Sequence, residues 1–418
     1  MRDAYVLSAC RTPIGRFQGE LSSLTATALG AIVVREAVQR ARLSVAAVNE
    51  VILGHVLTAG AGQAPARQAA IAAGLPDSVA ALTINKVCGS GLKAIMLAAQ
   101  ATHCGDADVV VAGGMESMSR AGWVLPRDAA RVGDRMLLDS LTHDGLTCAF
   151  SGDAMGKIAD QLAEINGISR TEQDLYALQS HQRAIQAIDS GAFDDEIVPV
   201  IVPTPAGESA VVRDSGPRRD TTLECLAALQ PAFGPPGTGE PGTGEPGTGE
   251  PGTGQPGTGQ PGTVTAGNAS TISDGAAAVV VGNRSASERS GQRPLCRIVA
   301  SATAGSEPSQ LFVTPVEAVL NVVRKSGHSL SEIDLFEINE AFAVQMLACL
   351  NQLAIPVDRV NVNGGAIALG HPIGASGARV LVTLLHALRA RGGRLGVAAL
   401  CLGGGNAVAM LVDTEVSP

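Results

Sequence analysis

The sequence predicts an α/β protein made of two similar halves with an inserted loop domain, and three observations support this. The 418 residues are 45% hydrophobic but only 2% aromatic, so the core must consist of Ala, Val, Leu and Ile, as in sheets covered by helices. Short apolar runs alternate with helical periodicity in two separate stretches. These stretches also resemble each other, which indicates an internal duplication. The length favours two or three domains over a single core.

The first stretch, residues 1–118, has the rhythm of βαβ units. Its strands are short apolar runs, and its helices repeat apolar residues every three to four positions. We expect strands at residues 4–8, 48–53, 80–85 and 108–112, and helices at 24–40, 63–73 and 92–101. This stretch and residues 272–292 form the predicted N-terminal domain.

Residues 119–271 have a less regular pattern and form the predicted loop domain. One clear helix begins at a capping box, Ser169-Arg170-Thr171-Glu172, and runs toward Ser190. Residues 236–260 repeat Pro-Gly-Thr-Gly-Glu/Gln five times. Proline fixes φ, glycine frees it and no apolar side chain is available for burial, so we expect a mobile surface loop here. A neutral length expansion explains this repeat better than a spacer or docking role.

The βαβ rhythm returns in residues 293–418, the predicted C-terminal domain. We expect strands at 295–300, 335–338, 359–362 and 394–400, and helices at 315–326, 341–353 and 378–390. Residues 48–54 can be aligned with 333–339, and Ser90-Gly91 with Ser376-Gly377, each pair standing before a helix. Two such units would bring their glycine turns together across a shared interface.

Charge and cysteine content exclude several classes of function. The formal charge is −9 and no long Lys/Arg cluster occurs, which argues against a general binder of nucleic acid or anionic membranes. The start has no signal-peptide pattern and no apolar run approaches the ~18 residues of a membrane span, so we expect a cytoplasmic protein. The eight cysteines include no C-x-x-C pair, so we expect neither a metal site nor a disulfide framework.

Three glycine-rich turns carry the residues that indicate chemistry. Cys88 stands in Asn85-Lys86-Val87-Cys88-Gly89-Ser90-Gly91, His371 in residues 363–377, and Cys401 in Cys401-Leu402-Gly403-Gly404-Gly405-Asn406. Glycine lets the backbone approach a substrate closely, because it has no Cβ. Cys88 directly precedes a helix whose N-terminal dipole favours a thiolate. Two cysteines and a histidine in such turns indicate covalent acyl transfer. The other six cysteines are interpreted as buried apolar side chains.

Six motifs, in this order along the chain, resemble those of the thiolases, acetyl-CoA C-acetyltransferases and 3-ketoacyl-CoA thiolases. They are Asn85-x-x-Cys88-x-Ser90-Gly91, residues 113–119, residues 262–270, Asn339-Glu340-Ala341-Phe342-Ala343, Gly370-His371-Pro372-x-Gly374-Ala375-Ser376-Gly377 and Cys401-x-Gly403-Gly404-Gly405. The resemblance covers essentially the whole chain except the pentapeptide repeat. It implies the thiolase fold, in which two duplicated domains pack as an α-β-α-β-α core.

The resemblance implies acetyl-CoA C-acetyltransferase activity, the reversible condensation of two acetyl-CoA to acetoacetyl-CoA and CoA through an acyl-Cys88 intermediate. Action on longer chains, as in degradative 3-ketoacyl-CoA thiolases of fatty acid metabolism, is the alternative. Coenzyme A and acyl-CoA would be substrates, with no tightly bound cofactor. The family also implies a homodimer or homotetramer.

The family's catalytic roles can be carried over to matching residues. Cys88 would hold the acyl group, and His371 would activate it and donate to the thioester oxygen of the enolate. Cys401 would be the acid/base at the α-carbon, and Asn339 would hold a water that completes the first oxyanion hole. The backbone N–H groups of Cys88 and Gly403 would form the second. We interpret Glu340 as a helix-start residue.

Substrate contacts follow from the same resemblance. Arg218 would face the nucleotide of coenzyme A and Ser270 the pantetheine, whereas Met155, Leu311 and Phe342 would line the acyl site. The chain departs from common family patterns at Ala154, at residues 308–315 and at Ser273, so its acyl pocket can differ.

Two other functions, a ketoacyl synthase and a CoA-binding scaffold, remain open, and a third, a cysteine hydrolase, fits less well. A decarboxylating ketoacyl synthase shares the duplicated fold, but its pattern requires a second histidine where this chain has Cys401. A CoA-binding scaffold without turnover would have no need for intact Cys88, Asn339, His371 and Cys401. A simple cysteine hydrolase would have no use for a second acid/base cysteine.

Overall fold

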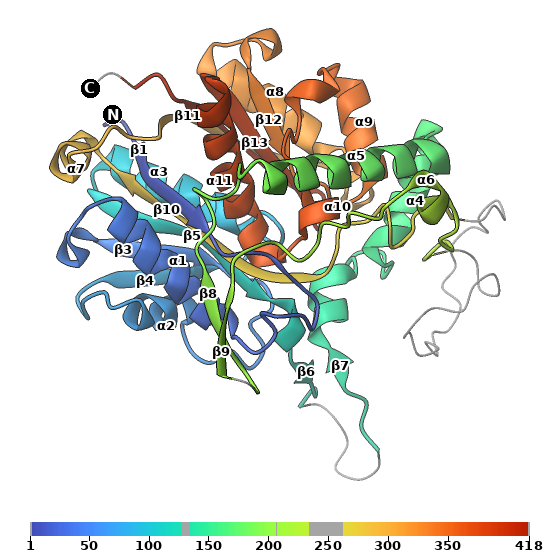
Figure 1. The fold of residues 1–418 in the computed structure, drawn as a ribbon, viewed down its shortest axis with the longest axis horizontal. Helices are drawn as coiled ribbons and strands as arrows, with labels where there is room; N and C mark the ends of the chain where they lie inside the picture. The colour runs from blue at the N-terminus through green and yellow to red at the C-terminus, as the bar shows by residue number, and fades with distance from the viewer. Residues whose placement is uncertain (1, 128–133, 206, 234–261, 417–418) are drawn as a thin grey trace.

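The computed structural model describes residues 2–127, 134–205, 207–233 and 262–416 (Figure 1). The whole pentapeptide repeat, and with it the prediction of a mobile loop at 236–260, therefore lies outside the described residues. In the described part of the chain, no helix is long and apolar enough to cross a membrane.

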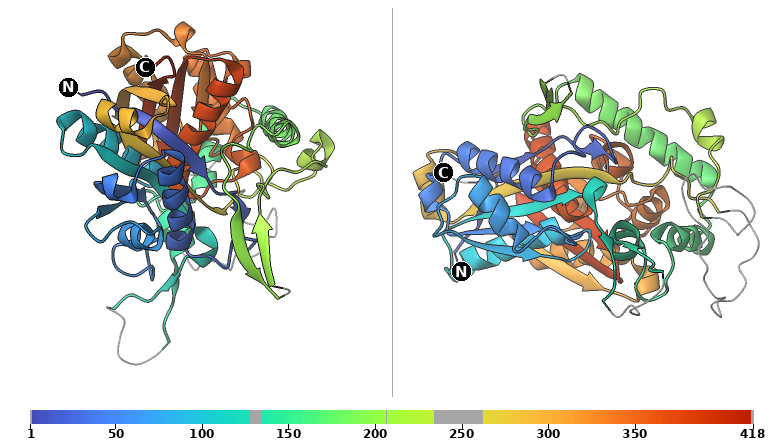
Figure 2. Two further views of the ribbon diagram at one scale, coloured as in Figure 1. Left: turned by 60° about the vertical axis from the view of Figure 1, so that its left-hand side comes forward. Right: turned by 90° about the horizontal axis from the view of Figure 1, so that it is seen from below.

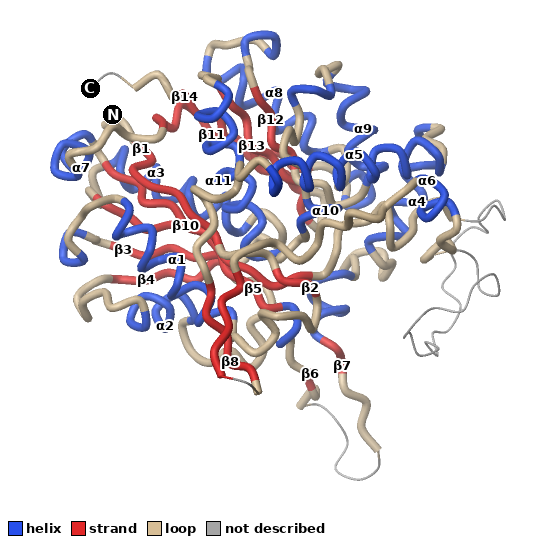
Figure 3. The backbone as a smooth tube through the Cα atoms, viewed as in Figure 1, coloured by secondary structure: helices blue, strands red, loops and turns tan. Residues whose placement is uncertain are grey.

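The strands form two half-sheets that meet at a short seam (Figure 3). The hydrogen-bonded order is β12-β13-β14-β11-β1-β10-β5-β3-β4, and β2 pairs with β10. At the seam, β1 and β11 pair only through Tyr5 with Arg297 and Val6 with Cys296. The N-terminal half contains β1 (Tyr5–Arg11), β2 (Gly15–Arg16), β3 (Glu50–Gly54), β4 (Ala80–Ile84), β5 (Val109–Ser117) and β10 (Ser273–Gly282). The C-terminal half contains β11 (Cys296–Gly305), β12 (Leu335–Ile338), β13 (Leu395–Leu402) and β14 (Asn406–Asp413).

Helices cover both half-sheets and fill the space between them. The central layer is α3 (Ser90–Cys104) with α11 (Ile373–Arg391), whose apolar residues share one core cluster with strands of both halves. The outer layers are α1 (Ala26–Arg40) and α2 (Pro65–Ala72) on one half, and α8 (Thr314–Ser326) and α9 (Ala343–Leu353) on the other. Figure 2 shows the mainly blue N-terminal half packed against the orange to red C-terminal half. The predicted α-β-α-β-α core is confirmed.

The two half-sheets have the same topology. In one, β3 pairs in parallel with β5, which pairs antiparallel with β10, and β10 pairs antiparallel with β1. In the other, β12, β13, β14 and β11 repeat this sequence of pairings. Val360 makes a single parallel bridge to Phe336, in the position that β4 occupies beside β3.

The predicted strand at 359–362 is therefore wrong. Residues Val357–Arg359 form a 3₁₀ turn, and Asn361 has a left-handed backbone with φ of 47°. Its side chain bonds the N–H and the carbonyl oxygen of Ile338, at 2.9 and 2.8 Å. An asparagine that bonds a neighbouring strand through its side chain can end pairing after one residue.

The loop domain contains more regular structure than the sequence predicts. The capping box is confirmed, since Ser169 and Glu172 bond each other's backbone at the start of α5 (Arg170–Asp189). Helix α4 (Met155–Asn166) and the strands β10 and β14 of the half-sheets were not predicted from the sequence. The remaining elements are β6 (Trp123–Val124), β7 (Leu138–Asp139), β8 (Val200–Thr204), β9 (Gly207–Val211), α6 (Leu223–Ala227), α7 (Arg284–Ser290) and α10 (Ala366–Leu369). The three domain boundaries stay predictions.

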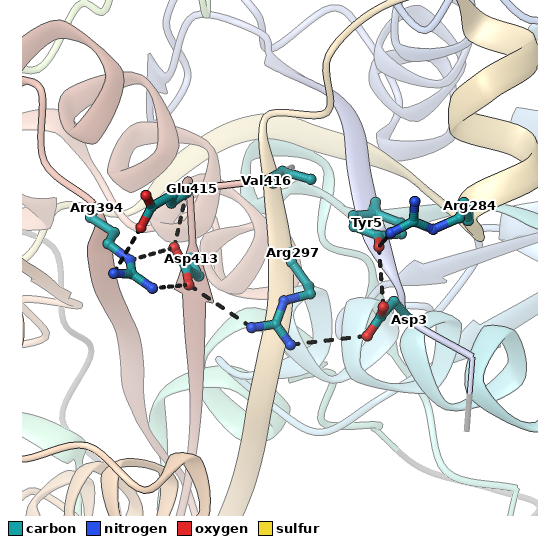
Figure 4. A pocket seen from close by; sticks show the side chains of 8 residues that line it. All are labelled: Asp3, Tyr5, Arg284, Arg297, Arg394, Asp413, Glu415 and Val416. Carbon is teal, nitrogen blue, oxygen red and sulfur yellow. Dashed lines mark hydrogen bonds and ion pairs between the residues drawn. The ribbon is translucent and has the colours of Figure 1, made fainter. Parts of the chain in front are cut away.

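Charged side chains line a surface pocket at the seam, near both ends of the chain (Figure 4). Arg297 lies 4.0 Å from Asp3 and 3.9 Å from Asp413, and Arg394 lies 3.1 Å from Asp413. Because both arginines are substantially exposed, each pair contributes little to stability. The arginines that line the pocket are balanced by an equal number of carboxylates. The pocket therefore has no net positive charge that would attract an anion.

Candidate active site

Direct contact between α3 and α11 brings the turns that precede them to one place. A Cβ at Gly91 would lie 2.6 Å from the backbone nitrogen of Ala378, and one at Gly377 would overlap the backbone of Leu92. Glycine at both positions lets the first turns of the two helices touch. Cys88 precedes α3 and His371 precedes α11, so the crossing draws the predicted nucleophile and the predicted base to the same end of the central layer.

A strained turn presents Cys88. Val87 has φ of 46°, a costly conformation for a β-branched residue. The Ser90 hydroxyl holds the turn by accepting from the Lys86 N–H at 2.8 Å and donating to the Val87 carbonyl at 2.6 Å. The Cys88 sulfur faces two hydrogen-bond donors, its own N–H and that of Gly403. This pair of N–H groups is the predicted second oxyanion hole.

The thiol of Cys88 is neutral in the free protein. Burial raises its pKa to about 12, although the N–H groups of Cys88 and Gly403 act in the opposite direction. The expectation that the helix dipole keeps Cys88 as a thiolate is therefore wrong for the unliganded protein. Burial removes the thiolate from water and raises its free energy by more than the helix N-terminus lowers it. The thiolate must be formed by proton transfer within the site.

The hydrogen bonds of His371 fix its tautomer. Its Nδ1 lies 2.6 Å from the Ser376 hydroxyl, which donates its only hydrogen to the Pro372 carbonyl at 2.9 Å. The hydroxyl must therefore accept from Nδ1–H, which leaves Nε2 with a free lone pair. Burial, with a smaller effect of Arg379, lowers the pKa of His371 to about 3, so the ring is neutral at rest.

Cys401 and Asn339 lie at neighbouring strand ends. Ile338 pairs with Ala399 between β12 and β13, so Asn339 continues β12 beside the last residues of β13. Burial, with nearby Cys88 and Cys349, raises the pKa of Cys401 well above its ordinary value. Asn339 is fully buried, and neither its Oδ1 nor its Nδ2 has a partner among the described residues. Such an amide fits a bound water or substrate oxygen.

The predicted acyl-site residues share one cluster with Cys401. Leu311 is buried in it, and Met155 and Phe342 pack against it half-buried. The Phe342 ring stands edge-on to that of Phe312, with centroids 5.2 Å apart. Ser270 lies beside them, because its N–H bonds the Ala341 carbonyl at 3.0 Å. The structure thus brings Ser270 and all three predicted acyl-site residues together.

Arg218 lies on a different segment, beside α10. Gly216 packs so closely against the Ala368 carbonyl that a Cβ would overlap it, and the Arg218 N–H donates to Nδ1 of His181 at 3.2 Å. The Arg218 side chain is exposed and pairs with no carboxylate in the described part of the chain. Arg219 instead forms an ion pair with Asp189 at 2.5 Å. Arg218 is thus the neighbour available for a phosphate.

Glu340 has a different role from the one predicted. It is buried and does not begin α9, which starts at Ala343. Its carboxylate accepts four hydrogen bonds, from Tyr176 Oη at 3.1 Å, Ser180 Oγ at 2.7 Å, Asn361 Nδ2 at 3.0 Å and Ile367 N at 3.2 Å. It ties the loop-domain helix α5 to the C-terminal half. No local pattern reveals such distant partners.

No group of three or more acidic, His or Cys side chains that could hold a metal occurs among the described residues.

Comparison with known proteins places this geometry in a family. The thiolase N-terminal domain model matches residues 4–244 and 255–285, and the thiolase C-terminal domain model matches 292–414. The gap at 245–254 falls inside the pentapeptide repeat. An acetyl-CoA acetyltransferase of Pseudomonas aeruginosa is 49% identical over 99% of this chain and 100% of its own length. The cytosolic acetyl-CoA acetyltransferase of Mus musculus is 47% identical over 98% of this chain and 97% of its own.

Solved structures agree. The acetyl-CoA acetyltransferase of Bacillus anthracis superposes with a TM-score of 0.90 at 40% identity, covering 99% of each chain. A thiolase of Ascaris suum, solved in complex with coenzyme A, has a TM-score of 0.87 at 41% identity, covering 99% of this chain and 100% of that one. With both domain models matched and full-length relatives at this identity, the chain belongs to the thiolase family.

Proposed function

We propose that this protein is an acetyl-CoA C-acetyltransferase that condenses two acetyl-CoA to acetoacetyl-CoA and CoA, or runs the thiolytic reverse. The observation that carries the proposal is the Cys88 sulfur, which faces the N–H groups of Cys88 and Gly403 and lies near the second thiol, Cys401. The relatives named above, which match nearly the whole chain, support acetyl-CoA as the substrate.

In the first half-reaction, Cys88 gives its proton to Nε2 of His371 and its sulfur attacks the acetyl-CoA carbonyl. The two N–H groups stabilise the oxyanion of the tetrahedral intermediate. Collapse breaks the bond to the CoA sulfur, which leaves with the proton of Cys401. Burial holds that proton on Cys401 in the free protein, so Cys401 acts first as an acid. The products are acetyl-Cys88, a Cys401 thiolate and protonated His371.

In the second half-reaction, the Cys401 thiolate removes an α-proton from another acetyl-CoA. Protonated His371, together with a water on Asn339, stabilises the enolate oxygen. The enolate carbon attacks the acetyl carbonyl on Cys88, and the Cys88 thiolate leaves. That thiolate recovers its proton from His371, so every group returns to its starting state.

Coenzyme A would lie along the loop domain as a substrate, with no tightly bound cofactor. The exposed guanidinium of Arg218 is suited to a nucleotide phosphate, and Ser270 lies next to the acyl-site cluster, where the pantetheine ends. The Ascaris suum thiolase, solved with coenzyme A, supports binding of this ligand.

The alternative is a degradative 3-ketoacyl-CoA thiolase of fatty acid metabolism that acts on longer chains. Leu311 and Phe312 are buried in the same cluster as Cys401, and bulky apolar side chains at this place would favour a short acyl group. A ketoacyl synthase or an inactive CoA-binding scaffold would be expected to lack the paired Cys88 and Cys401.

We also propose that the protein is a cytoplasmic homodimer or homotetramer. Strand β4 is the last in the described sheet and leaves Leu82 41% exposed. The β6–β7 hairpin exposes Trp123 by 68% and Met136 by 74%. Sheet edges and clustered exposed apolar side chains are common self-association surfaces.

The test is CoA-dependent cleavage of acetoacetyl-CoA by the wild type and Cys88→Ser, beside a 3-ketoacyl-CoA of longer chain. Cleavage of acetoacetyl-CoA that requires both CoA and Cys88 supports the proposal. Cleavage of only the longer substrate would move the assignment to the degradative enzyme. Cleavage of neither would favour a synthase or an inactive binder.

A further inference from the structure

Glu116, at the end of β5, is a buried carboxylate to which the mechanism above assigns no role. It is fully buried and accepts hydrogen bonds from the N–H groups of Val56 at 3.1 Å, Leu57 at 3.3 Å and Gly374 at 3.0 Å. Two of these donors follow β3 in the N-terminal half, and the third belongs to α11. One side chain therefore joins the two duplicated halves at the level of the active site.

The Gly374 bond is placed to act on His371. Gly374 is the second residue of α11, three positions after His371. The first N–H groups of a helix have no partner within the helix and favour a negative charge, which Glu116 supplies. The Gly374 carbonyl is clamped too: a Cβ at Gly54 would lie 2.8 Å from it, and one at Gly114 would overlap it. The N–H and the carbonyl of Gly374 are therefore both in contact with the other half.

His55 completes the arrangement. Its ring is only 2% exposed, and Nε2 lies 3.3 Å from a Glu116 oxygen. Burial lowers the pKa of His55 to about 4, so the ring is neutral. The His55 N–H bonds the Ile84 carbonyl at 3.0 Å, at the end of the strand that leads to Cys88. His55 thus contacts both the Glu116 side chain and the approach to the nucleophile.

We propose that Glu116, supported by His55, is a positioning residue that holds the His371 turn in register with Cys88 and sets the reactivity of the Cys88 thiol. The inference rests on the proposed roles of Cys88 and His371. It predicts two separable effects of Glu116. Its hydrogen bond to Gly374 positions the His371 turn, and its negative charge disfavours ionisation of the Cys88 thiol.

The charge effect has a definite direction. Burial raises the pKa of Glu116 to about 7, while its three backbone donors oppose the rise and the Asp274 carboxylate on β10 adds to it. Its described charged or titratable neighbours are His55 after β3, Asp274 on β10 and Cys88 before α3. The Glu116 charge raises the pKa of Cys88. Removing it should make the thiol easier to ionise.

The test compares Glu116→Gln, His55→Gln and His55→Leu with the wild type. Two quantities are measured: steady-state thiolysis of acetoacetyl-CoA, and the pH midpoint for alkylation of Cys88 by iodoacetamide, read by peptide mass mapping. Asp413→Asn is the matched control, since Asp413 is also nearly buried but bonds Arg394 at the far end of β14.

We expect Glu116→Gln to lower kcat about 10- to 100-fold, as a small misplacement of a catalytic group does, with KM changed less than about twofold. The alkylation midpoint should at the same time move to lower pH. His55→Gln keeps a donor toward Glu116 and should retain most of kcat, whereas His55→Leu should not. Asp413→Asn should lower the melting temperature without moving kcat or the midpoint.

Wild-type kcat and an unmoved midpoint in Glu116→Gln would overturn the inference, as would a loss of kcat with an unmoved midpoint. If Glu116→Gln does not fold, the His55 pair decides, and equal kcat in His55→Gln and His55→Leu overturns it. An inactive wild type would instead count against the proposed function. The alkylation midpoints would then still test the charge effect by themselves.

Discussion

Asn339 and Asn361 are two buried asparagines. Replacing Asn339 should lower kcat, whereas replacing Asn361 should lower the free energy of unfolding. Neither polar atom of the Asn339 side chain has a partner among the described residues. Asn361 bonds the Ile338 N–H at 2.9 Å, the Ile338 carbonyl at 2.8 Å and Glu340 at 3.0 Å. The Asn339 amide is therefore available to bind a water or a substrate oxygen, whereas the Asn361 amide stabilises the folded structure.

The structure gives the expected size of each effect. Asn339→Ala breaks no hydrogen bond within the described protein but removes the support for one oxyanion, which typically costs about 10²- to 10³-fold in kcat, or ~3 to 4 kcal/mol of transition-state stabilisation. Asn361→Ala removes three hydrogen bonds at about 1 kcal/mol each, so the free energy of unfolding should fall by roughly 3 kcal/mol. Its left-handed backbone adds to that loss.

The assay is thiolysis of acetoacetyl-CoA at saturating CoA, with the melting temperature of each variant measured in parallel. Asn339→Ala should melt close to the wild type and turn over at least 100-fold more slowly. Asn361→Ala should melt several degrees lower. A stable Asn339→Ala with wild-type kcat would refute the assignment of Asn339 to the oxyanion hole, and so would a melting loss as large as that of Asn361→Ala.

Three further predictions address the insert, the coenzyme segment and the pH dependence. Deleting residues 236–260 should leave kcat and KM unchanged, because the Ala232 N–H bonds the Val264 carbonyl at 2.9 Å and so joins the described residues on either side of the insert. A large loss of turnover would contradict this. Gly216→Ala should raise KM for CoA severalfold with little change in kcat, because a Cβ there overlaps the Ala368 carbonyl and displaces the segment that contains Arg218. An unchanged KM would show that this segment does not contribute to CoA binding. Burial lowers the pKa of His55 and His181 to about 4 and of His371 to about 3, from 6.5. The unfolded chain therefore takes up more protons at these three rings below pH 6.5, which lowers stability as the pH falls from 7 to 5. Buried Glu116 and Glu337, whose pKa is raised to about 7 and about 8, act in the opposite direction, so the urea midpoint of Glu116→Gln should fall more between pH 7 and pH 5 than that of the wild type, and an equal fall would contradict this balance.

Much of the fold could be predicted from local patterns, because most helices and strands carry clear apolar periodicity. The helix expected at 24–40 is observed as α1 (Ala26–Arg40), and the strand at 335–338 has the predicted bounds. The missed strand β10 is rich in Ala and Gly, which carry little strand preference. The false strand at 359–362 has suitable apolar residues, but Asn361 bends the backbone out of the extended region.

The candidate site was predictable where a motif places a residue in a glycine turn, as for Cys88, His371 and Cys401. It was not predictable where partners are distant in sequence. Glu116 meets Gly374 across 258 positions, and no local pattern contains that contact. The ionisation of Cys88 was mispredicted for a related reason. A helix N-terminus can be read from the sequence, but the burial that outweighs it depends on the whole fold.

The most direct test of the central claim is mass mapping of the protein after brief reaction with acetyl-CoA and an acid quench. We predict a single acetyl group on the peptide that contains Cys88, which disappears when excess CoA is added before the quench and is absent in Cys88→Ser. An acetyl group on another residue, or no acetylated peptide under conditions in which acetoacetyl-CoA is cleaved, would contradict transfer through Cys88.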